Sequence, residues 1–386
     1  MELTSPNITK FNMNWRNKNL ESLTKNIASG KSLTNNSNGE YPIYGSTGII
    51  GFSKNFDYEG IKLLVARVGA NAGTINRVIG KYCVSDNTLM VTTNSEYDTN
   101  FAYYQLLYFN LNKLVFGSGQ PLITGGQLKQ IELNIPPTLT EQKAIADALT
   151  DVDELITNLE KLIAKKKAIK QGAMQQLLKP KKDWRTVTIY ELAEEKKSNF
   201  DDGDWIESEY IIDSGIRLIQ TGNIGVGCFI EKETKKYISN DSFIKLRCKE
   251  VLKGDLLICR LAEPAGRACV MPNIGEQKVI TSVDVSIFRG DTELVEREFL
   301  SQYFTTSKWF NQVLERVGGT THKRISRGAL GKIQFKIPNI EQQKEIASIL
   351  SEMDKEVELL ENKKDKMIGF KQGMMQELLT GKTRLI

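Results

Sequence analysis

The stretch EQKAIADALTDVDELITNLEKLIAKKKAIKQGAMQQLL, residues Glu141–Leu178, occurs a second time as QQKEIASILSEMDKEVELLENKKDKMIGFKQGMMQELL, residues Gln342–Leu379. The two stretches are identical at 16 of 38 positions with a constant offset of 201 residues. A repeat of this length indicates a duplicated structural unit. Because the chain holds only two copies, about 200 residues apart, it is predicted to contain two similar modules in tandem and not a solenoid.

Both repeats carry the start signals and the apolar spacing of long helices. Thr138 with Glu141 forms a T-x-x-E capping box, and Asn339 with Gln342 stands at the equivalent place in the second repeat. We expect the two helices to pair antiparallel, and the alternative is two surface helices that cover the mixed domains. Apolar residues follow at alternating spacings of four and three, as in a coiled-coil seam: Ile145, Leu149, Val152, Ile156, Leu159 and Ile163, then Ile346, Leu350, Met353, Val357 and Leu360.

Lysines interrupt the seam near its centre in both copies. They are Lys166 and Lys170 in the first helix and Lys364 and Lys371 in the second. Three interpretations are open for the mid-helix lysine runs: a solvated helix face, contact with DNA that passes alongside, or pairing with acidic residues of a docked subunit. The interruption itself favours a hydrated or partner-bound central stretch.

The repeats also divide the chain into two equivalent modules. Trp15-Arg16 and Trp184-Arg185 each open a mixed segment, and each segment closes on a short apolar stretch that ends in Ile-Pro. We predict an α+β protein in which two globular domains are separated by two long antiparallel helices that form a coiled-coil rod, with pseudo-two-fold symmetry. The predicted boundaries are a first domain at 1–137, a first helix at 138–178, a linker at 179–183, a second domain at 184–338, a second helix at 339–380 and a tail at 381–386.

The composition is that of an ordinary globular protein. The chain has 386 residues, of which 40% are hydrophobic and 26% charged, and its net charge of +5 permits a polyanionic partner without requiring one. Its five cysteines form no C-x-x-C pair, which fits a reducing compartment, and the single histidine, His322, argues against a zinc site. No apolar run is long enough for a membrane helix and no signal peptide is visible, so a cytoplasmic location is expected.

Several motifs in a fixed order resemble the specificity subunits of type I restriction–modification systems. The resemblance covers nearly the whole chain, and the order and doubling of the motifs make it more specific than any one motif. These are the helix openings of the form I-P-(x)n-E-Q-x-x-I-A-x-x-L-x-x-x-D at Ile135–Asp153 and Ile337–Asp354, the two Q-G-x-M-Q-x-L-L helix ends, and the domain segments Tyr41–Gly51, Gly117–Thr124, Lys253–Arg260 and Glu263–Val270.

The resemblance implies a function for each part. Each globular domain would be a target-recognition domain that reads one half of a split double-stranded DNA sequence, and the helices would fix the gap between the halves. Two modification subunits would dock on the helices and methylate adenine with S-adenosylmethionine. Two restriction subunits would complete an ATP- and magnesium-dependent nuclease. These cofactors are expected on the partner subunits, with none bound by this chain.

Motifs of catalysis are weak, in agreement with a non-catalytic subunit. The run Asn134–Pro137 differs in spacing from the N-P-P-[YF] motif of adenine methyltransferases and is better explained as a helix-start signal. Gly30-Lys31-Ser32 ends like a P-loop, but Lys25 stands where that motif requires a glycine. A Ser-His-Asp triad would have to use His322, and no G-x-S-x-G elbow accompanies it.

Candidate DNA-binding residues lie on glycine-rich loops of both domains. Phosphates are bound by Lys, Arg and backbone amides, whereas Arg, Asn and Gln read base edges. The alternative is that these loops are merely solvated, and His322 in particular fits a structural role equally well. The candidates are Arg67, Asn71 and Gln120 in the first domain, and Arg260, Arg267, His322, Lys323, Arg324 and Arg327 in the second.

For partner docking, the resemblance points to repeated residues of the helices. They are Gln142, Ile145 and Gln171 in the first copy and Gln343, Ile346 and Gln372 in the second. Two other functions stay open: a specificity subunit for a related system with a fused nuclease–methyltransferase partner, and a scaffold whose domains bind protein instead of DNA. A scaffold would lack the steep salt dependence that phosphate contacts give to DNA affinity.

Overall fold

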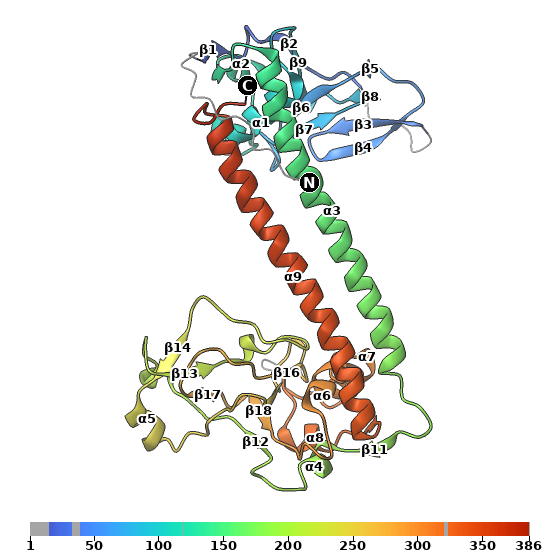
Figure 1. Ribbon diagram of the computed structural model, residues 1–386, viewed down its shortest axis with the longest axis vertical. Helices are drawn as coiled ribbons and strands as arrows, with labels where there is room; N and C mark the ends of the chain where they lie inside the picture. Colours follow the sequence, from blue (N-terminus) through green and yellow to red (C-terminus); the bar gives the residue numbers. More distant parts are fainter. Residues whose placement is uncertain (1–14, 33–38, 118, 320–322, 386) are drawn as a thin grey trace, which may run out of the picture. The chain divides into compact units, whose positions relative to one another are not determined.

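The computed structural model describes residues 15–32, 39–117, 119–319 and 323–385. The chain divides into two compact units, residues 1–162 with 360–386 and residues 163–359. Each unit contains one globular head and the neighbouring parts of both long helices, α3 (Leu139–Leu177) and α9 (Ile340–Leu378) (Figure 1). We call residues 15–137 the first head and residues 184–338 the second head.

The first head is built on two four-stranded sheets. One is antiparallel in the order β2-β9-β6-β7, and the other, in the order β4-β3-β8-β5, contains the parallel pair β3–β8. A ladder of β1 and β10 joins the start of the head to its end. The strands are β1 (Arg16–Asn19), β2 (Thr24–Ser29), β3 (Tyr41–Gly45), β4 (Gly48–Ser53), β5 (Tyr58–Glu59), β6 (Lys62–Ala66), β7 (Ile75–Val78), β8 (Lys81–Val84), β9 (Thr88–Thr93) and β10 (Glu132–Ile135).

The second head repeats this arrangement. Its antiparallel sheet has the order β12-β18-β15-β16, its smaller sheet contains the parallel pair β13–β17, and β11 pairs with β19 as β1 does with β10. One scaffold is therefore used twice, although the sequences of the heads match poorly. The strands are β11 (Arg185–Val187), β12 (Phe200–Asp202), β13 (Ile216–Ile219), β14 (Lys236–Ile238), β15 (Leu256–Cys259), β16 (Ala268–Val270), β17 (Val279–Thr281), β18 (Val285–Phe288) and β19 (Phe335–Ile337).

In each head one helix packs on the antiparallel four-stranded sheet, which is β2-β9-β6-β7 in the first head and β12-β18-β15-β16 in the second. This helix carries an aromatic contact that is repeated in the two heads. Phe101 of α1 meets the ring of Trp15 edge-on at 6.3 Å, and Phe299 of α6 meets Trp184 in the same way at 6.0 Å. The head helices are α1 (Thr99–Phe109), η1 (Leu111–Leu114), α2 (Gly125–Lys129), α4 (Ile189–Leu192), η2 (Ser208–Tyr210), η3 (Thr221–Asn223), α5 (Asn240–Lys245), α6 (Arg297–Tyr303), α7 (Ser307–Leu314) and α8 (Arg327–Gly331).

The two long helices are antiparallel within each unit. In the second unit Lys170 pairs with Asp354 and Lys166 with Glu356, so the register runs in opposite directions. The core of the first head includes Leu149 from the start of α3 together with Leu378 from the end of α9, and the second core combines Leu350 with Leu178 in the same way. Each head therefore buries the start of one long helix and the end of the other. The alternative of two unpaired surface helices, each covering a head, does not describe this arrangement.

The described residues hold neither a membrane-length apolar helix nor a cluster of side chains suited to a metal ion. None of the described helices is both long and apolar enough to cross a membrane. No group of three or more His, Cys, Asp or Glu side chains in the described segments is arranged to hold a metal. The five cysteines are all free thiols.

Candidate nucleic-acid interface

In the second head, the loops that follow or precede the strands of the four-stranded sheet meet at one edge. The amide of Arg260, just after β15, donates to the carbonyl of Asp284 at 2.8 Å, and the amide of Ile325 donates to the carbonyl of Arg260 at 3.0 Å. At the end of β12, the Gly203 amide donates to the Val285 carbonyl at 2.8 Å. We call the region formed by residues 201–205, 260–267, 282–284 and 318–327, as far as they are described, the second loop edge.

The first head has the same backbone bonds at the equivalent place. The Arg67 amide donates to the Asn87 carbonyl at 2.9 Å, and the Ile123 amide donates to the Arg67 carbonyl at 2.9 Å. The Gly30 amide donates to the Thr88 carbonyl at 3.0 Å. Residues 28–32, 67–74, 85–88 and 116–125, as far as they are described, thus form the first loop edge, in which Arg67 corresponds to Arg260.

A glycine turns the loop that precedes α2 or α8 at the same point in both heads. Gly117 has φ of 100° and Gly319 has φ of 101°, a region that residues with a Cβ rarely adopt. These glycines lie inside matching bridges, Phe116 with Leu122 and Gly318 with Arg324. The loops aligned from sequence are therefore equivalent in structure, and their side chains differ while the backbone is kept.

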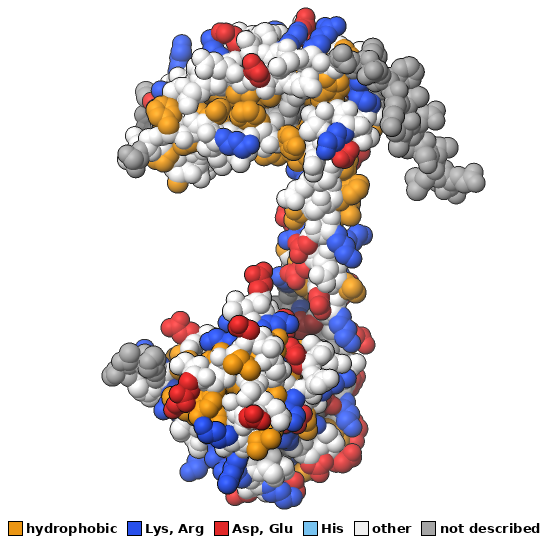
Figure 2. Space-filling view, turned by 90° about the vertical axis from the view of Figure 1, so that its left-hand side faces the viewer, with side chains coloured by type: hydrophobic (Ala, Val, Ile, Leu, Met, Phe, Trp, Pro, Cys, Tyr) orange, Lys and Arg blue, Asp and Glu red, His pale blue; other side chains and the backbone are white. Residues whose placement is uncertain are grey.

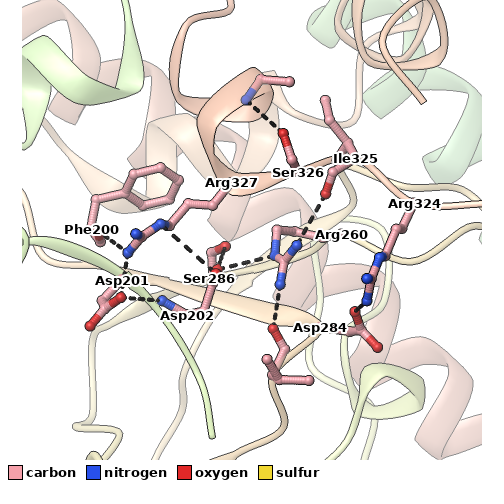
Figure 3. A network of polar contacts seen from close by, with 12 residues as sticks. Phe200, Asp201, Asp202, Arg260, Asp284, Ser286, Arg324, Ile325, Ser326 and Arg327 are labelled. Atoms are coloured by element: carbon pink, nitrogen blue, oxygen red, sulfur yellow. Dashed lines mark hydrogen bonds and ion pairs between the residues drawn. The ribbon is translucent and has the colours of Figure 1, made fainter. Parts of the chain in front are cut away.

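Three arginines and three aspartates interact at the second loop edge (Figure 3). Arg327, at the start of α8, pairs with Asp201 and donates to the Phe200 carbonyl at 3.2 Å. Nε of Arg260 lies 3.1 Å from Asp202, and Arg324 lies 3.5 Å from Asp284. Burial favours a higher pKa for Asp201, but hydrogen bonds from Lys249 and a backbone amide, with the charges of Lys249 and Arg327, hold its pKa below the usual value.

Two arginines predicted to bind DNA have their guanidinium groups committed inside the second head. Arg260 is 6% exposed and donates to the carbonyls of Val283 and Ile325 in addition to its contact with Asp202. Arg267 donates to four backbone carbonyls, those of Thr221, Ile224, Leu261 and Pro264. This placement corrects the expectation from sequence: both side chains hold loops together and neither presents its donors to a groove.

The other candidates of the second head lie at the rim of the same edge. Lys323 and Arg324 are exposed, and among the described residues the Arg324 guanidinium has only its long contact with Asp284. Arg327 is half-buried in its pairing with Asp201. His322 lies outside the described residues. Lys323 and Arg324 are therefore the described cations of the predicted loop that are accessible.

The three candidates of the first head come together. The amide of Gly69 donates to the carbonyl of Pro121 at 2.9 Å, so the turn that carries Asn71 adjoins the loop that carries Gln120. Asn71 and Gln120 are exposed, whereas Arg67 is half-buried at the end of β6. Among the described residues, the Arg67 Nε is buried and has no hydrogen-bond acceptor.

Four of the six predicted docking residues are buried in the heads of this chain. Gln142 accepts a bond from the Asp98 amide at 2.8 Å, and Gln343 accepts one from the Glu296 amide at 3.0 Å, so each glutamine fixes a long helix to the capping residue of a head helix. Ile145 and Ile346 are also buried. This corrects their expected role, because a side chain inside its own head is not available to a partner. Gln171 and Gln372 are exposed.

Sequence reasoning missed a repeated junction at the aspartate that ends the helix-opening motif. Asp153 accepts a bond from the Tyr104 hydroxyl at 2.8 Å and pairs with Lys371 at 2.6 Å. Asp354 accepts one from Gln302 at 2.9 Å and pairs with Lys170. Lysines of the interrupted seam are thus paired inside the chain, and the signal was present in the sequence as an aspartate and a lysine conserved between the two repeats.

Charge by itself does not set one region apart on the face shown in Figure 2. On the face shown in Figure 2, lysine and arginine side chains are scattered over both heads among acidic ones. The second loop edge carries in addition Trp205, three residues after Asp202, whose side chain is 68% exposed and was not predicted as a site residue. The exposed tryptophan offers this edge a stacking surface, and the exposed Lys323 and Arg324 offer phosphate-binding groups.

Comparison with known proteins agrees with the doubled scaffold. The protein family described as "Type I restriction modification DNA specificity domain" matches residues 12–171 and again residues 181–367. The type I restriction enzyme MjaVIII specificity subunit of Methanocaldococcus jannaschii is 25% identical over 341 residues, which is 82% of this chain and 78% of that protein. A putative type I restriction enzyme specificity subunit of Haemophilus influenzae is 25% identical over 339 residues, 82% of this chain and 80% of its own length.

A solved structure has the same fold. The crystal structure of the type I restriction–modification S subunit from M. genitalium superposes with a TM-score of 0.68 at 16% identity and covers 97% of this chain and 99% of that one. At this identity the likeness concerns the fold alone, whereas the family match covers both modules of the sequence. The chain belongs to the family of type I restriction–modification DNA specificity subunits.

Proposed function

We propose that this chain reads a two-part double-stranded DNA sequence, one part with each head, and that it performs no catalysis itself. The observation that carries the proposal is the pair of loop edges, which share their backbone bonds and differ in their side chains. A common scaffold with divergent edge residues is suited to two different sequences read in the same geometry.

The proposed contacts follow the chemistry of the accessible side chains. In the second head, Lys323 and Arg324 would bind phosphates or base edges, since both carry exposed cationic donors. In the first head, the exposed Asn71 and Gln120 would read base edges. A side-chain amide can accept a hydrogen bond from N6 of adenine and donate one to N7.

The proposed partners are two modification subunits and two restriction subunits, and S-adenosylmethionine, ATP and magnesium would bind to those subunits. Equivalent exposed residues on the long helices support two equal docking places. Gln171 and Gln372 are exposed at matching repeat positions, and beside them Ile169 and Phe370 are 47% and 56% exposed. Exposed apolar side chains at equivalent positions are typical of a surface that another protein covers.

The test is to map methylated adenines in a host that carries this gene with the genes of its modification and restriction subunits. A split motif with a fixed gap is the expected result. A continuous motif would exclude two-headed reading, and no motif, together with no salt-dependent DNA affinity of the purified complex, would favour a protein-binding scaffold. A fused nuclease–methyltransferase partner would instead show this chain to be a subunit of the related system.

A further inference from the structure

Arg67 and Arg260 occupy the same position in the two heads but have different surroundings. Both arginines follow the third strand of the four-stranded sheet, β6 or β15, and their main-chain groups make the same two bonds. Their side chains continue the sheet face that packs in the head core, since Leu63 and Val65 precede Arg67 at alternate positions. Any difference between the two guanidinium groups therefore comes from the neighbouring side chains.

The second head neutralises its arginine. Asp202 at the end of β12 lies 3.1 Å from Nε of Arg260, and two backbone carbonyls accept from the remaining nitrogens. A buried guanidinium is stable only when a carboxylate and further acceptors replace its water. Asp202 is in turn held by the Ser286 hydroxyl at 2.7 Å.

The first head lacks the acidic side chains and the neighbouring arginine of this network. The strand register places Ser29, at the end of β2, where the second head has Asp202. Leu89 and Ser286 each pair with the residue two positions before the arginine, and Ser29 pairs with Leu89 as Asp202 pairs with Ser286. Asn87 likewise replaces Asp284. Gly125, the first residue of α2, stands where α8 begins with Arg327, so the neighbouring arginine is missing as well.

Arg67 is consequently a half-buried cation without a partner in the described part of the chain. No hydrogen bond or ion pair of its guanidinium is found among the described residues. The Nε of each arginine is buried without a hydrogen bond, so the difference lies in the ion pair of Arg260 with Asp202 and in the bonds of its Nη atoms to two carbonyls. The exposed Asp86 beside it makes no ion pair with it. Because Arg67 is only half-buried, a bound partner could supply acceptors to its guanidinium without displacing a hydrogen bond or ion pair within the described part of the chain.

We infer that Arg67 binds acceptor atoms of DNA through the first head, whereas Asp202 has made the equivalent Arg260 a structural residue. The inference rests on the proposed function, and it names the Arg67 guanidinium as the group that binds DNA at the first loop edge. The guanidinium presents a fork of donors that matches either two phosphate oxygens or O6 and N7 of guanine. The two heads would then use one conserved arginine position for two different purposes.

The test measures the affinity of the complex with its modification subunits for duplexes that carry the mapped motif and all its single base-pair changes. Arg67→Ala is expected to weaken binding about tenfold to a hundredfold. Ser29→Asp should weaken it in the same direction, because a carboxylate at that position would occupy Arg67 as Asp202 occupies Arg260. Lys25→Ala, which removes an exposed cation of the same head, should change affinity less than about twofold.

Two results support the inference and also distinguish the acceptors. For guanine, the loss is confined to one base pair and Arg67→Lys does not restore it. For phosphate, the loss is equal for all sequences, the salt slope falls by about one, and Arg67→Lys retains most of the affinity.

Two other results overturn it. The first is an Arg67→Ala variant that is folded by circular dichroism and binds as the unmodified chain does. The second is a Ser29→Asp variant that gains thermal stability and loses no affinity, which would make Arg67 purely structural. If the unmodified complex itself binds no specific sequence, the proposed function fails, and this inference fails with it.

Discussion

The loop edges and the helix junctions of the two heads have diverged to different degrees. At the junctions, Gln142 and Gln343 make the same bonds to a capping residue, and Asp153 and Asp354 each pair with a lysine of the other helix. At the loop edges the backbone bonds, one arginine position and the turn glycine are kept, while most other side chains differ. Under the proposed function, the junctions present one geometry to equal partner subunits, while the edges vary with the sequence that each head reads.

The largest effect should come from changing the helices, because they are the part that both heads share. Removing residues 159–162 together with the equivalent residues 360–363 shortens each helix by about 6 Å, close to two base pairs. Adenine methylation at the original motif should fall more than about a hundredfold, and a motif with a smaller gap should replace it.

The control for this change keeps the helix register. Removing seven residues from each helix preserves the heptad phase of the seam, so it shortens the helices with less disturbance of their pairing. Both variants need circular dichroism to show that they are helical. Methylation on an unchanged gap in a folded variant would show that helix length does not set the spacing.

The second largest effect concerns the arginine position that distinguishes the two edges. Asp202→Ala leaves Arg260 buried without its carboxylate and should lower the free energy of unfolding of the second head by about 3 kcal/mol. Ser29→Ala at the equivalent place should cost less than about 0.5 kcal/mol. Urea unfolding followed by tryptophan fluorescence reports mainly the second head, which holds Trp184, Trp205 and Trp309. Equal costs at the two positions would contradict the difference described for the edges.

How much of this was visible in the sequence depends on the range of the contacts. The helices were predicted at 138–178 and 339–380 and are found at Leu139–Leu177 and Ile340–Leu378, because capping and seam spacing are local signals. Only half of the predicted capping box forms, since the Glu141 carboxylate binds Arg384 of the C-terminal tail. The buried, structural role of Arg260 could not be predicted from sequence, because its acceptors include Asp202 and the Ile325 carbonyl, which are 58 and 65 positions away.

The third effect tests the conserved side of the comparison. Gln343→Ala removes the acceptor of the Glu296 amide and the donor to the Pro338 carbonyl in a buried place, so it should cost about 2 kcal/mol. Gln142→Ala should cost the same in the first head, where hydrogen exchange at Asp98–Phe101 is the measurement. The exposed Gln372→Ala should cost less than about 0.5 kcal/mol. Different costs for Gln142 and Gln343 would mean that the two junctions are not equivalent.

The smallest effect is a dependence on pH that only the second edge should show. The pKa of Asp201 is lowered in the folded chain from an ordinary value of 3.8, so its pairing stabilises the fold above that value. This stability is lost as pH falls below about 4 through the lowered folded-state pKa, because protonation then favours the unfolded chain. The free energy of unfolding of the unmodified chain should therefore exceed that of Asp201→Asn by a constant amount from pH 7 to pH 5, and this excess should shrink below pH 4.

Asp204 opposes this trend, and the contrast gives the prediction its control. Burial raises the pKa of Asp204, so its protonation favours the folded chain at low pH and partly offsets the loss at Asp201. The net change should be well under the cost of Asp202→Ala. Asp213→Asn, at an exposed position of the same head, is the control variant when the unfolding midpoints in urea are compared at each pH. The first edge has Ala28 where β12 carries Asp201. A substitution of Ala28 should therefore leave the dependence of unfolding stability on pH below 4 unchanged.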